Sequence, residues 1–238
     1  MEIGPGLGAL SLHLAATGRP FVAVELDLRL ADAMERELMA FPRARVVRGD
    51  ILDQRLDALV PEPERITIVG NLPYSITTPA LEWVIGQADR VRRALLMVQR
   101  EYADRLTAAP GSKEYGTVTV FVGLNATAKR HFRVSPGAFY PRPQVESVVL
   151  EVAPRAYAGT TLEEREAAAR LARASMGTRR KTLGNSLKRG LGVGAGEARA
   201  LLDEAGLDPA RRGETLSIGD FVRLARVWIR RDRPGGVA

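Results

Sequence analysis

The first hundred residues alternate between short apolar runs and longer amphipathic stretches. The runs predict buried strands at residues 1–4, 21–25, 44–48, 66–70 and 94–99. The stretches between them place apolar residues at helical spacing, which predicts helices at residues 7–16, 28–41, 51–59 and 79–87. Such alternation is typical of a parallel sheet covered by helices on both faces. Right-handed crossovers bring the carboxyl ends of the strands to one edge, where ligands bind in these sheets.

The pattern changes after residue 99. A helix is predicted at 101–106, residues 116–124 fit either a helix or a strand, and two strands joined by a proline-rich connection are predicted at 128–134 and 146–152. Beyond residue 154 the spacing predicts only helices, at residues 162–176, 181–191, 197–205 and 217–230. We therefore predict an α/β domain over residues 1–154 and a small all-helical domain over residues 155–238.

Charge separates the two predicted domains. Residues 1–154 hold 18 basic and 18 acidic side chains, whereas residues 155–238 hold 17 basic and 10 acidic ones. The whole net charge of +7 therefore lies in the last third of the chain, which indicates a neutral domain joined to one that faces a polyanion. A solvated basic surface without a partner has the same composition. Five basic residues gather around one predicted helix start, where each can neutralise an RNA phosphate: Arg179, Arg180, Lys181, Lys188 and Arg189.

The composition also excludes several classes of site. The chain has no cysteine, which rules out disulfides and thiolate metal sites and is typical of a reducing cytoplasm. His13 and His131 are the only histidines, so we expect no metal centre. The longest apolar runs are far too short to cross a bilayer, and the N-terminal residues lack the pattern of a signal peptide. We expect a cytoplasmic protein without a membrane partner.

A glycine-rich loop follows the first predicted strand. Gly4 and Gly6 allow the backbone to turn sharply and to approach a ligand at a helix N-terminus. Glu25 ends the second predicted strand, where a carboxylate can bind ribose hydroxyls, and Asp50 ends the third. The loop also matches the dinucleotide fingerprint, a weak signal by itself, so an NAD-dependent dehydrogenase is an alternative. The three strand ends together favour a nucleoside-containing cofactor.

The segment Asn71-Leu72-Pro73-Tyr74 follows the fourth predicted strand. The carbonyl oxygen of Asn71 can accept a hydrogen bond from an exocyclic amine, and Tyr74 can stack on a flat base. Pro73 stiffens the backbone between them. Acceptors that hold the protons of an aromatic amine direct its lone pair at an electrophile, which is catalysis by positioning. The base has to be unstacked to enter such a site. A turn with a capping amide and a half-buried tyrosine is the structural alternative.

These motifs together resemble the ribosomal RNA adenine N6-dimethylases, a family of class I S-adenosylmethionine-dependent methyltransferases. The resemblance is carried by Glu-Ile-Gly-Pro-Gly at 2–6, Val-Glu-Leu-Asp at 24–27, Gly-Asp at 49–50 and Asn-Leu-Pro-Tyr at 71–74. Ser-Lys-Glu-Tyr-Gly at 112–116, Phe-Tyr-Pro-Arg-Pro at 139–143 and Arg-Arg-Lys-Thr-Leu at 179–183 extend it over nearly the whole chain. Leu72 and the Arg-Arg-Lys segment look like the kasugamycin-sensitivity branch, which acts on the small ribosomal subunit.

The resemblance implies a fold, a reaction and a role for each matched residue. It implies a Rossmann-like methyltransferase sheet that dimethylates adenine N6 on two adjacent adenosines, in a hairpin loop near the 3′ end of 16S rRNA. Gly4 and Gly6 then approach the methionine part of S-adenosylmethionine, Glu25 its ribose and Asp50 its adenine, and Asn71 also belongs to the cofactor-binding residues. Asn71, the Leu72 carbonyl and Tyr74 hold the target base, and Phe139 stacks on its other face. From the residues alone, Phe139 between prolines is equally a core anchor for a loop.

The implied partners are small-subunit rRNA and the 30S particle, bound by a monomer. Family members begin with a further segment that helps to close the cofactor site, whereas this chain begins at Met1, inside the first predicted strand. We therefore expect either that the start of the chain is truncated or that the cofactor site is more open than is usual in the family. A non-catalytic ribosome-assembly factor that keeps the fold is a further alternative, and cofactor binding separates it from the enzyme.

Overall fold

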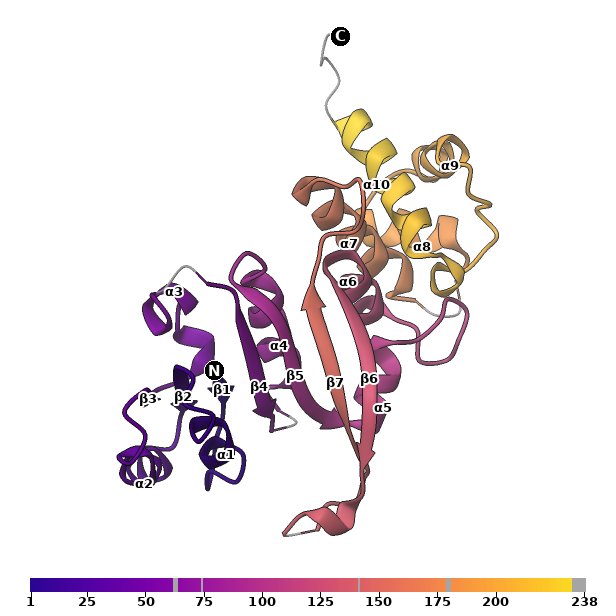
Figure 1. Ribbon diagram of the computed structural model, residues 1–238. Helices are drawn as coiled ribbons and strands as arrows, with labels where there is room; N and C mark the ends of the chain where they lie inside the picture. Colours follow the sequence, from indigo (N-terminus) through magenta and orange to yellow (C-terminus); the bar gives the residue numbers. More distant parts are fainter. Residues whose placement is uncertain (62–63, 74, 141, 179–180, 233–238) are drawn as a thin grey trace. The chain divides into compact units, whose positions relative to one another are not determined.

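The computed structural model describes residues 1–61, 64–73, 75–140, 142–178 and 181–232, which form two compact units (Figure 1). A sheet unit comprises Met1–Ala103 and Thr127–Pro154, and a helical unit comprises Asp104–Ala126 and Arg155–Ala238. The sequence-based division placed residues 104–126 in the first domain. They group with the helical unit because Tyr115, Val120 and Leu124 are buried in its core.

The sheet unit is built on a seven-stranded mixed sheet in the order β3-β2-β1-β4-β5-β7-β6. The strands are β1 (Glu2–Ile3), β2 (Phe21–Glu25), β3 (Ala44–Arg48), β4 (Ile66–Asn71), β5 (Val91–Gln99), β6 (Ala126–Val134) and β7 (Ser147–Pro154). Neighbouring strands from β3 to β5 are parallel, as the sequence predicts. β7 is antiparallel to β5, so the late pair of strands extends the sheet beyond its parallel part.

Short helices pack their apolar sides against these strands. α1 (Ser11–Ala15) and α2 (Leu28–Leu38) contribute Ala15, Met34 and Leu38 to a cluster with Phe21 of β2. Asp27 caps α2, since its carboxylate accepts hydrogen bonds from the N–H groups of two first-turn residues. α4 (Thr77–Gly86) buries Ala80, Leu81 and Val84 and contacts β5 and β7. The remaining short elements of this unit are η1 (Ile51–Asp53), α3 (Leu56–Leu59), η2 (Pro136–Ala138) and the first turn of α5 (Arg100–Leu106).

Two predicted helices differ from the observed ones. The helix predicted at 7–16 begins only at Ser11, because Gly8 has a φ of +81° and residues 7–10 continue the glycine loop. The helix predicted at 51–59 is divided into η1 and α3 by extended backbone at Gln54 and Arg55. The carbonyl of Gln54 accepts a hydrogen bond from the indole N–H of Trp83 at 2.9 Å instead of continuing a helix.

The helical unit consists of α6 (Thr117–Asn125), α7 (Leu162–Met176), α8 (Leu183–Leu191), α9 (Ala195–Glu204), η3 (Gly213–Thr215) and α10 (Ile218–Asp232), with the end of α5. Its core contains Leu171, Leu187 and Phe221. The ambiguous stretch at 116–124 is helical in α6, since this core buries its apolar side chains and overrides their β propensity. The buried Tyr115 hydroxyl donates to the Leu216 carbonyl at 2.8 Å, and burial raises the pKa of Tyr115 to about 12.

Over the described ranges, no helix is both long enough and apolar enough to span a membrane. Among the same residues, no three His, Cys, Asp or Glu side chains are grouped so that they could hold a metal ion. His13 is exposed on α1, and His131 lies on β6 with its Nε2 atom 3.2 Å from the Glu151 carboxylate.

Candidate active site

Four parallel neighbouring strands end at the same edge of the sheet. β1 leads into Gly4, β2 ends at Glu25, β3 leads into Gly49 and Asp50, and β4 ends at Asn71. The chain runs from β1 through β2 to β3 on one side, and β4 and β5 lie on the other side of β1. This reversal of strand order is the position at which open α/β sheets bind ligands. The predicted glycine, carboxylate and amide groups thus lie at neighbouring positions along one edge.

The loop after β1 has the backbone conformation that requires glycine. Gly4 and Gly6 have φ values of +64° and +56°, which cost side-chain-bearing residues about 1–2 kcal/mol. A Cβ atom added at either position meets no other atom within 4 Å. The positive φ angles, and not a lack of space for a side chain, therefore require glycine at these two positions. The loop leaves open space in which a ligand can approach the backbone.

Glu25 is tied to this loop by its side chain. One carboxylate oxygen accepts a hydrogen bond from the Gly6 N–H at 3.0 Å, and the other accepts from the Asp27 N–H at 3.0 Å. The residue is 7% exposed. A carboxylate has about four lone-pair positions, so each oxygen of Glu25 can still accept from a hydroxyl. Two backbone donors fix its orientation, which suits a ribose ligand.

Glu2 is a buried acidic residue of β1, and the sequence analysis assigned it no role. It is 3% exposed, and its carboxylate accepts a hydrogen bond from the Ser11 hydroxyl at 2.6 Å. Burial raises the pKa of Glu2, while the bond from Ser11 opposes that shift. The contact joins β1 to the start of α1 and so holds both ends of the glycine loop. The signal available in the sequence was an acidic residue in a strand otherwise predicted to be buried.

Asp50 lies just beyond β3 and is half-buried. One of its carboxylate oxygens caps η1 by accepting a hydrogen bond from the Leu52 N–H at 2.9 Å. The preceding Gly49 donates its N–H to the Glu25 carbonyl at 2.8 Å, which holds the ends of β2 and β3 together. The open glycine loop and the two oriented carboxylates fit a cofactor that carries a ribose and an adenine.

Asn71 and its neighbours are fixed from two sides. Asn71 is exposed at the end of β4, and its backbone pairs with Met97 of β5. Leu72 is buried, and its N–H donates to the Met97 carbonyl at 3.4 Å. The Pro73 carbonyl accepts hydrogen bonds at the start of α4, from the Ile76 N–H at 3.1 Å and from the Thr77 hydroxyl at 3.1 Å. The segment therefore presents the Asn71 amide on a backbone held by both β5 and α4. Tyr74 lies outside the described residues.

Phe139 lies in the connection between β6 and β7 and is half-buried. Its N–H donates to the Pro136 carbonyl at 3.3 Å, which closes η2. β6 and β5 are each antiparallel to β7, so the carboxyl end of β6 and this connection lie at the edge where β4 ends (Figure 1). The topology thus brings Phe139 to the same edge as Asn71.

The predicted RNA-binding residues belong to the helical unit. Lys181 is exposed just before α8, and Lys188 and Arg189 are exposed in its last turn. The opposite side of α8 buries Leu183 and Leu187 in the core. Arg179 and Arg180 lie outside the described residues. α8 therefore presents a basic surface to solvent, which is compatible with RNA binding and with a solvated face.

The strand order and this edge define the protein as a class I methyltransferase in fold. The family model described as "Ribosomal RNA adenine dimethylase" matches residues 1–229. The chain belongs to this family, whose members are enzymes. A relative from Geobacter metallireducens, named "Ribosomal RNA small subunit methyltransferase A", is 41% identical over 96% of this chain and 84% of its own length. A relative of the same name from Geobacillus thermodenitrificans is 36% identical over 96% of this chain and 80% of its own length.

Solved structures have the same architecture. A dimethyladenosine transferase from Plasmodium falciparum matches with a TM-score of 0.82 over 97% of this chain and 90% of its own length, at 22% identity, which concerns the fold alone. The 23S rRNA methyltransferase ErmE matches with a TM-score of 0.68 over 95% of this chain and 88% of its own length, at 25% identity. The predicted fold class is therefore confirmed, and so is the family resemblance. The family also implies a methyl donor of the S-adenosylmethionine type.

Proposed function

We propose that this protein dimethylates adenine N6 on two adjacent adenosines in a hairpin loop near the 3′ end of 16S rRNA, with S-adenosylmethionine as donor. The observation that carries the proposal is the presence of the glycine loop, Glu25, Asp50 and Asn71 at one sheet edge of a family member. The names of its relatives, which specify the small ribosomal subunit, support the choice of RNA.

In this proposal the residues at the carboxyl ends of β1, β2 and β3 hold the cofactor. Gly4 and Gly6 expose their backbone to its methionine part, Glu25 accepts from the ribose hydroxyls, and Asp50 accepts from the adenine amine. S-adenosylmethionine supplies a methyl group on a positively charged sulfur. The two N–H groups that bind Glu25 keep its carboxylate oriented before the cofactor arrives, so little order has to be created on binding.

The target adenine is held by the segment after β4. The Asn71 side-chain oxygen and the Leu72 carbonyl each accept a hydrogen bond from one N–H of the N6 amine, which turns its lone pair away from these acceptors. Tyr74 stacks on one face of the base, Phe139 stacks on the other, and Pro73 fixes the backbone between the acceptors and the ring. The amine loses its proton to water after transfer, so the site needs no strong base. Catalysis then rests on positioning and electrostatics.

The helical unit is assigned to the RNA in this proposal. Arg179, Arg180, Lys181, Lys188 and Arg189 neutralise phosphates of folded rRNA in the 30S particle, and shape dominates over sequence in that recognition. We further propose that the protein acts as a cytoplasmic monomer.

The decisive experiment is transfer of radiolabelled methyl groups from S-adenosylmethionine to unmethylated 30S subunits, followed by digestion to nucleosides. We expect N6,N6-dimethyladenosine. Subunit binding without any transfer would instead support the non-catalytic assembly factor. A labelled nucleoside other than an N6-methylated adenosine would overturn the assignment of the base.

A further inference from the structure

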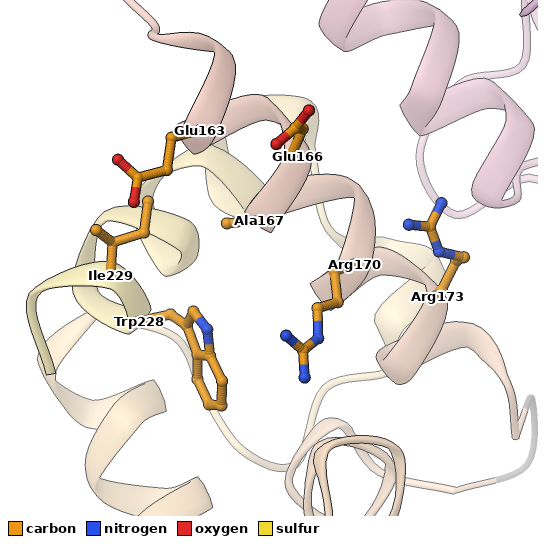
Figure 2. Close-up of a pocket in the computed structure, with 7 residues that line it drawn as sticks. All are labelled: Glu163, Glu166, Ala167, Arg170, Arg173, Trp228 and Ile229. Carbon is orange, nitrogen blue, oxygen red and sulfur yellow. The ribbon is translucent and has the colours of Figure 1, made fainter. Parts of the chain in front are cut away.

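A groove on the helical unit lies apart from every residue used above. It has a volume of about 320 Å³ and lies between α7 and α10, lined mainly by Glu163, Glu166, Arg170, Arg173 and Trp228 (Figure 2). The four charged residues recur at intervals of three and four, which places them along one side of α7. The opposite side of α7 is buried through Ala168, Leu171 and Ala172, so the charged side is left to the groove.

Trp228 is the aromatic wall of this groove. It is half-buried, with its inner part packed on the core of the unit. It also borders a second, smaller cavity of about 60 Å³ next to Leu201 and Arg231. Arg170 places its guanidinium carbon 5.9 Å from the centre of the indole ring, a distance typical of a cation–π contact. Figure 2 shows Arg170 and Trp228 extending toward the same hollow from α7 and α10.

The arginines of the groove differ from those of α10, which pair with carboxylates, and from Arg165 of α7, which hydrogen-bonds to Asn125 and Thr160. Arg226 pairs with Glu164, Arg223 with Asp220, and Arg230 and Arg231 both pair with Glu204. Within the part of the chain that the structure describes, no carboxylate forms an ion pair with Arg170 or Arg173. No carboxylate of the described residues therefore neutralises these two charges, which lie in the groove beside the half-buried indole ring of Trp228.

We propose that this groove binds one unpaired nucleotide of the RNA substrate, outside the methylated segment. The base stacks on Trp228 next to the Arg170 guanidinium, and Arg173, one turn along α7, binds an adjoining phosphate. The carboxylate of Glu166 accepts from a ribose hydroxyl or a base amine. Stacking on an aromatic side chain with arginines around it is how proteins hold single-stranded nucleic acid.

Size and charge select this ligand. The volume is at the lower end of the roughly 300–1,000 Å³ found for small-molecule sites, which suits a single nucleotide. The helical unit carries the whole +7 net charge of the chain, so it attracts a polyanion. The inference rests on the proposed function only in taking rRNA as the source of the nucleotide.

Fluorescence of Trp228 tests the proposal directly. The chain has two tryptophans, and Trp83→Phe leaves Trp228 as the sole reporter. An oligoadenylate of about ten nucleotides is titrated into this variant at low salt. We expect quenching by stacking of a base on the indole. Unchanged Trp228 emission at saturating oligoadenylate overturns the proposal. Adenosine monophosphate is titrated in parallel, and if it binds as tightly as the oligonucleotide, the groove is a free-nucleotide site and the RNA assignment is wrong.

Substitutions separate stacking from packing. Trp228→Leu is expected to weaken oligoadenylate affinity roughly tenfold or more, whereas Trp228→Tyr, which keeps an aromatic face, restores most of it. Thermal unfolding of both variants identifies any loss due to the core, and equal weakening in the two would contradict stacking. Arg170→Gln is expected to weaken binding and flatten its salt dependence. Arg199→Gln on α9 removes the same charge from a residue paired with Asp203 and serves as the matched control.

Methylation of 30S subunits by the same variants keeps the two proposals distinct. If the groove variants bind oligoadenylate as tightly as the unsubstituted protein and also methylate 30S subunits normally, the groove inference fails and the enzymatic function stands. If they lose oligoadenylate binding while the unsubstituted protein transfers no methyl group to any substrate, the groove stands and the proposed function fails.

Discussion

The two units of this protein hold their candidate functional side chains in different ways. In the sheet unit the candidate groups are fixed by the backbone: Glu25 by the N–H groups of Gly6 and Asp27, and Asp50 by that of Leu52. In the helical unit Lys181, Lys188 and Arg189 project from the surface of a helix whose other side is buried. Methyl transfer requires groups held to within a fraction of an ångström, whereas binding a folded polyanion requires charge in roughly the right region. We therefore expect substitutions in the sheet unit to lower methyl transfer and substitutions in the helical unit to lower RNA binding.

The largest effect is expected at Asn71. Replacing it by alanine removes one acceptor of the target amine, and removal of a single positioning hydrogen bond in such sites lowers kcat by roughly 10²- to 10³-fold. Subunit binding, which we assign to the helical unit, should stay within twofold. Single-turnover methylation measures the predicted loss of rate, and a parallel 30S binding assay measures the affinity for the subunit. Undiminished turnover would show that Asn71 does not position the target amine.

The glycine loop gives the next largest effect. Gly6→Ala introduces a side chain at a φ of +56°, costs about 1–2 kcal/mol in backbone strain and fills the open space above the loop. We expect a loss of at least roughly tenfold in S-adenosylmethionine affinity, measured by calorimetry.

Gly18→Ala is the control for that strain. Gly18 follows α1, has a φ of +69° and is equally free of neighbours around an added Cβ. The Gly18→Ala variant should lower the free energy of unfolding about as much as Gly6→Ala does, and it should leave cofactor affinity unchanged. If both variants lost affinity alike, the effect of Gly6 would be one of stability alone.

Charge reversal on α8 tests whether the basic residues of the helical unit bind RNA. The double variant Lys188→Glu, Arg189→Glu should weaken 30S binding by about tenfold and reduce the salt slope by roughly 1.5, if each residue contacts one phosphate. Cofactor affinity should not change. The matched control reverses two exposed arginines of the sheet unit, Arg19 and Arg92. Equal losses in both double variants would mean that only total charge matters, and unchanged binding would make α8 a solvated face.

The smallest effect concerns the alkaline stability of the helical unit. The pKa of Tyr115 is raised by burial to about 12, whereas in the unfolded chain it is about 10. The native state therefore keeps the phenol protonated where the unfolded state ionises it. Its contribution to stability is complete below about pH 10 and declines as the pH rises toward 12.

Tyr115→Phe isolates this contribution. It should cost about 1 kcal/mol at neutral pH, because the Leu216 carbonyl loses its donor, and flatten the loss of stability between pH 10 and 12. Urea unfolding at several pH values measures both. Tyr140→Phe removes a fully exposed phenol, so it should change neither the stability at neutral pH nor its loss between pH 10 and 12. An alkaline profile identical to that of the unsubstituted protein would show that Tyr115 is not the group responsible.

The alternation of strands and helices, the residue types at the ends of the strands and the uneven charge all follow from the sequence alone. Strand and helix periods are local, and parallel crossovers leave one edge for Gly4, Glu25, Asp50 and Asn71, so their proximity could be predicted. The motifs at 2–6 and 71–74 gave the family, which the comparisons confirm. The roles of the individual site residues remain predictions.

Features that depend on contacts between distant parts of the sequence could not be predicted and appear only in the folded structure. Residues 104–126 join the helical unit, and residues 116–124 form a helix, because a core built from α7 and later helices buries them. The pairing of Glu2 with Ser11 and the break at Gln54 arise from side chains that meet only in the folded chain. The groove of Trp228 and Arg170 has the same origin, since residues 58 positions apart come together only when α7 packs on α10. Local sequence patterns encode periodicity and residue chemistry, whereas burial is settled by packing between segments that the sequence keeps apart.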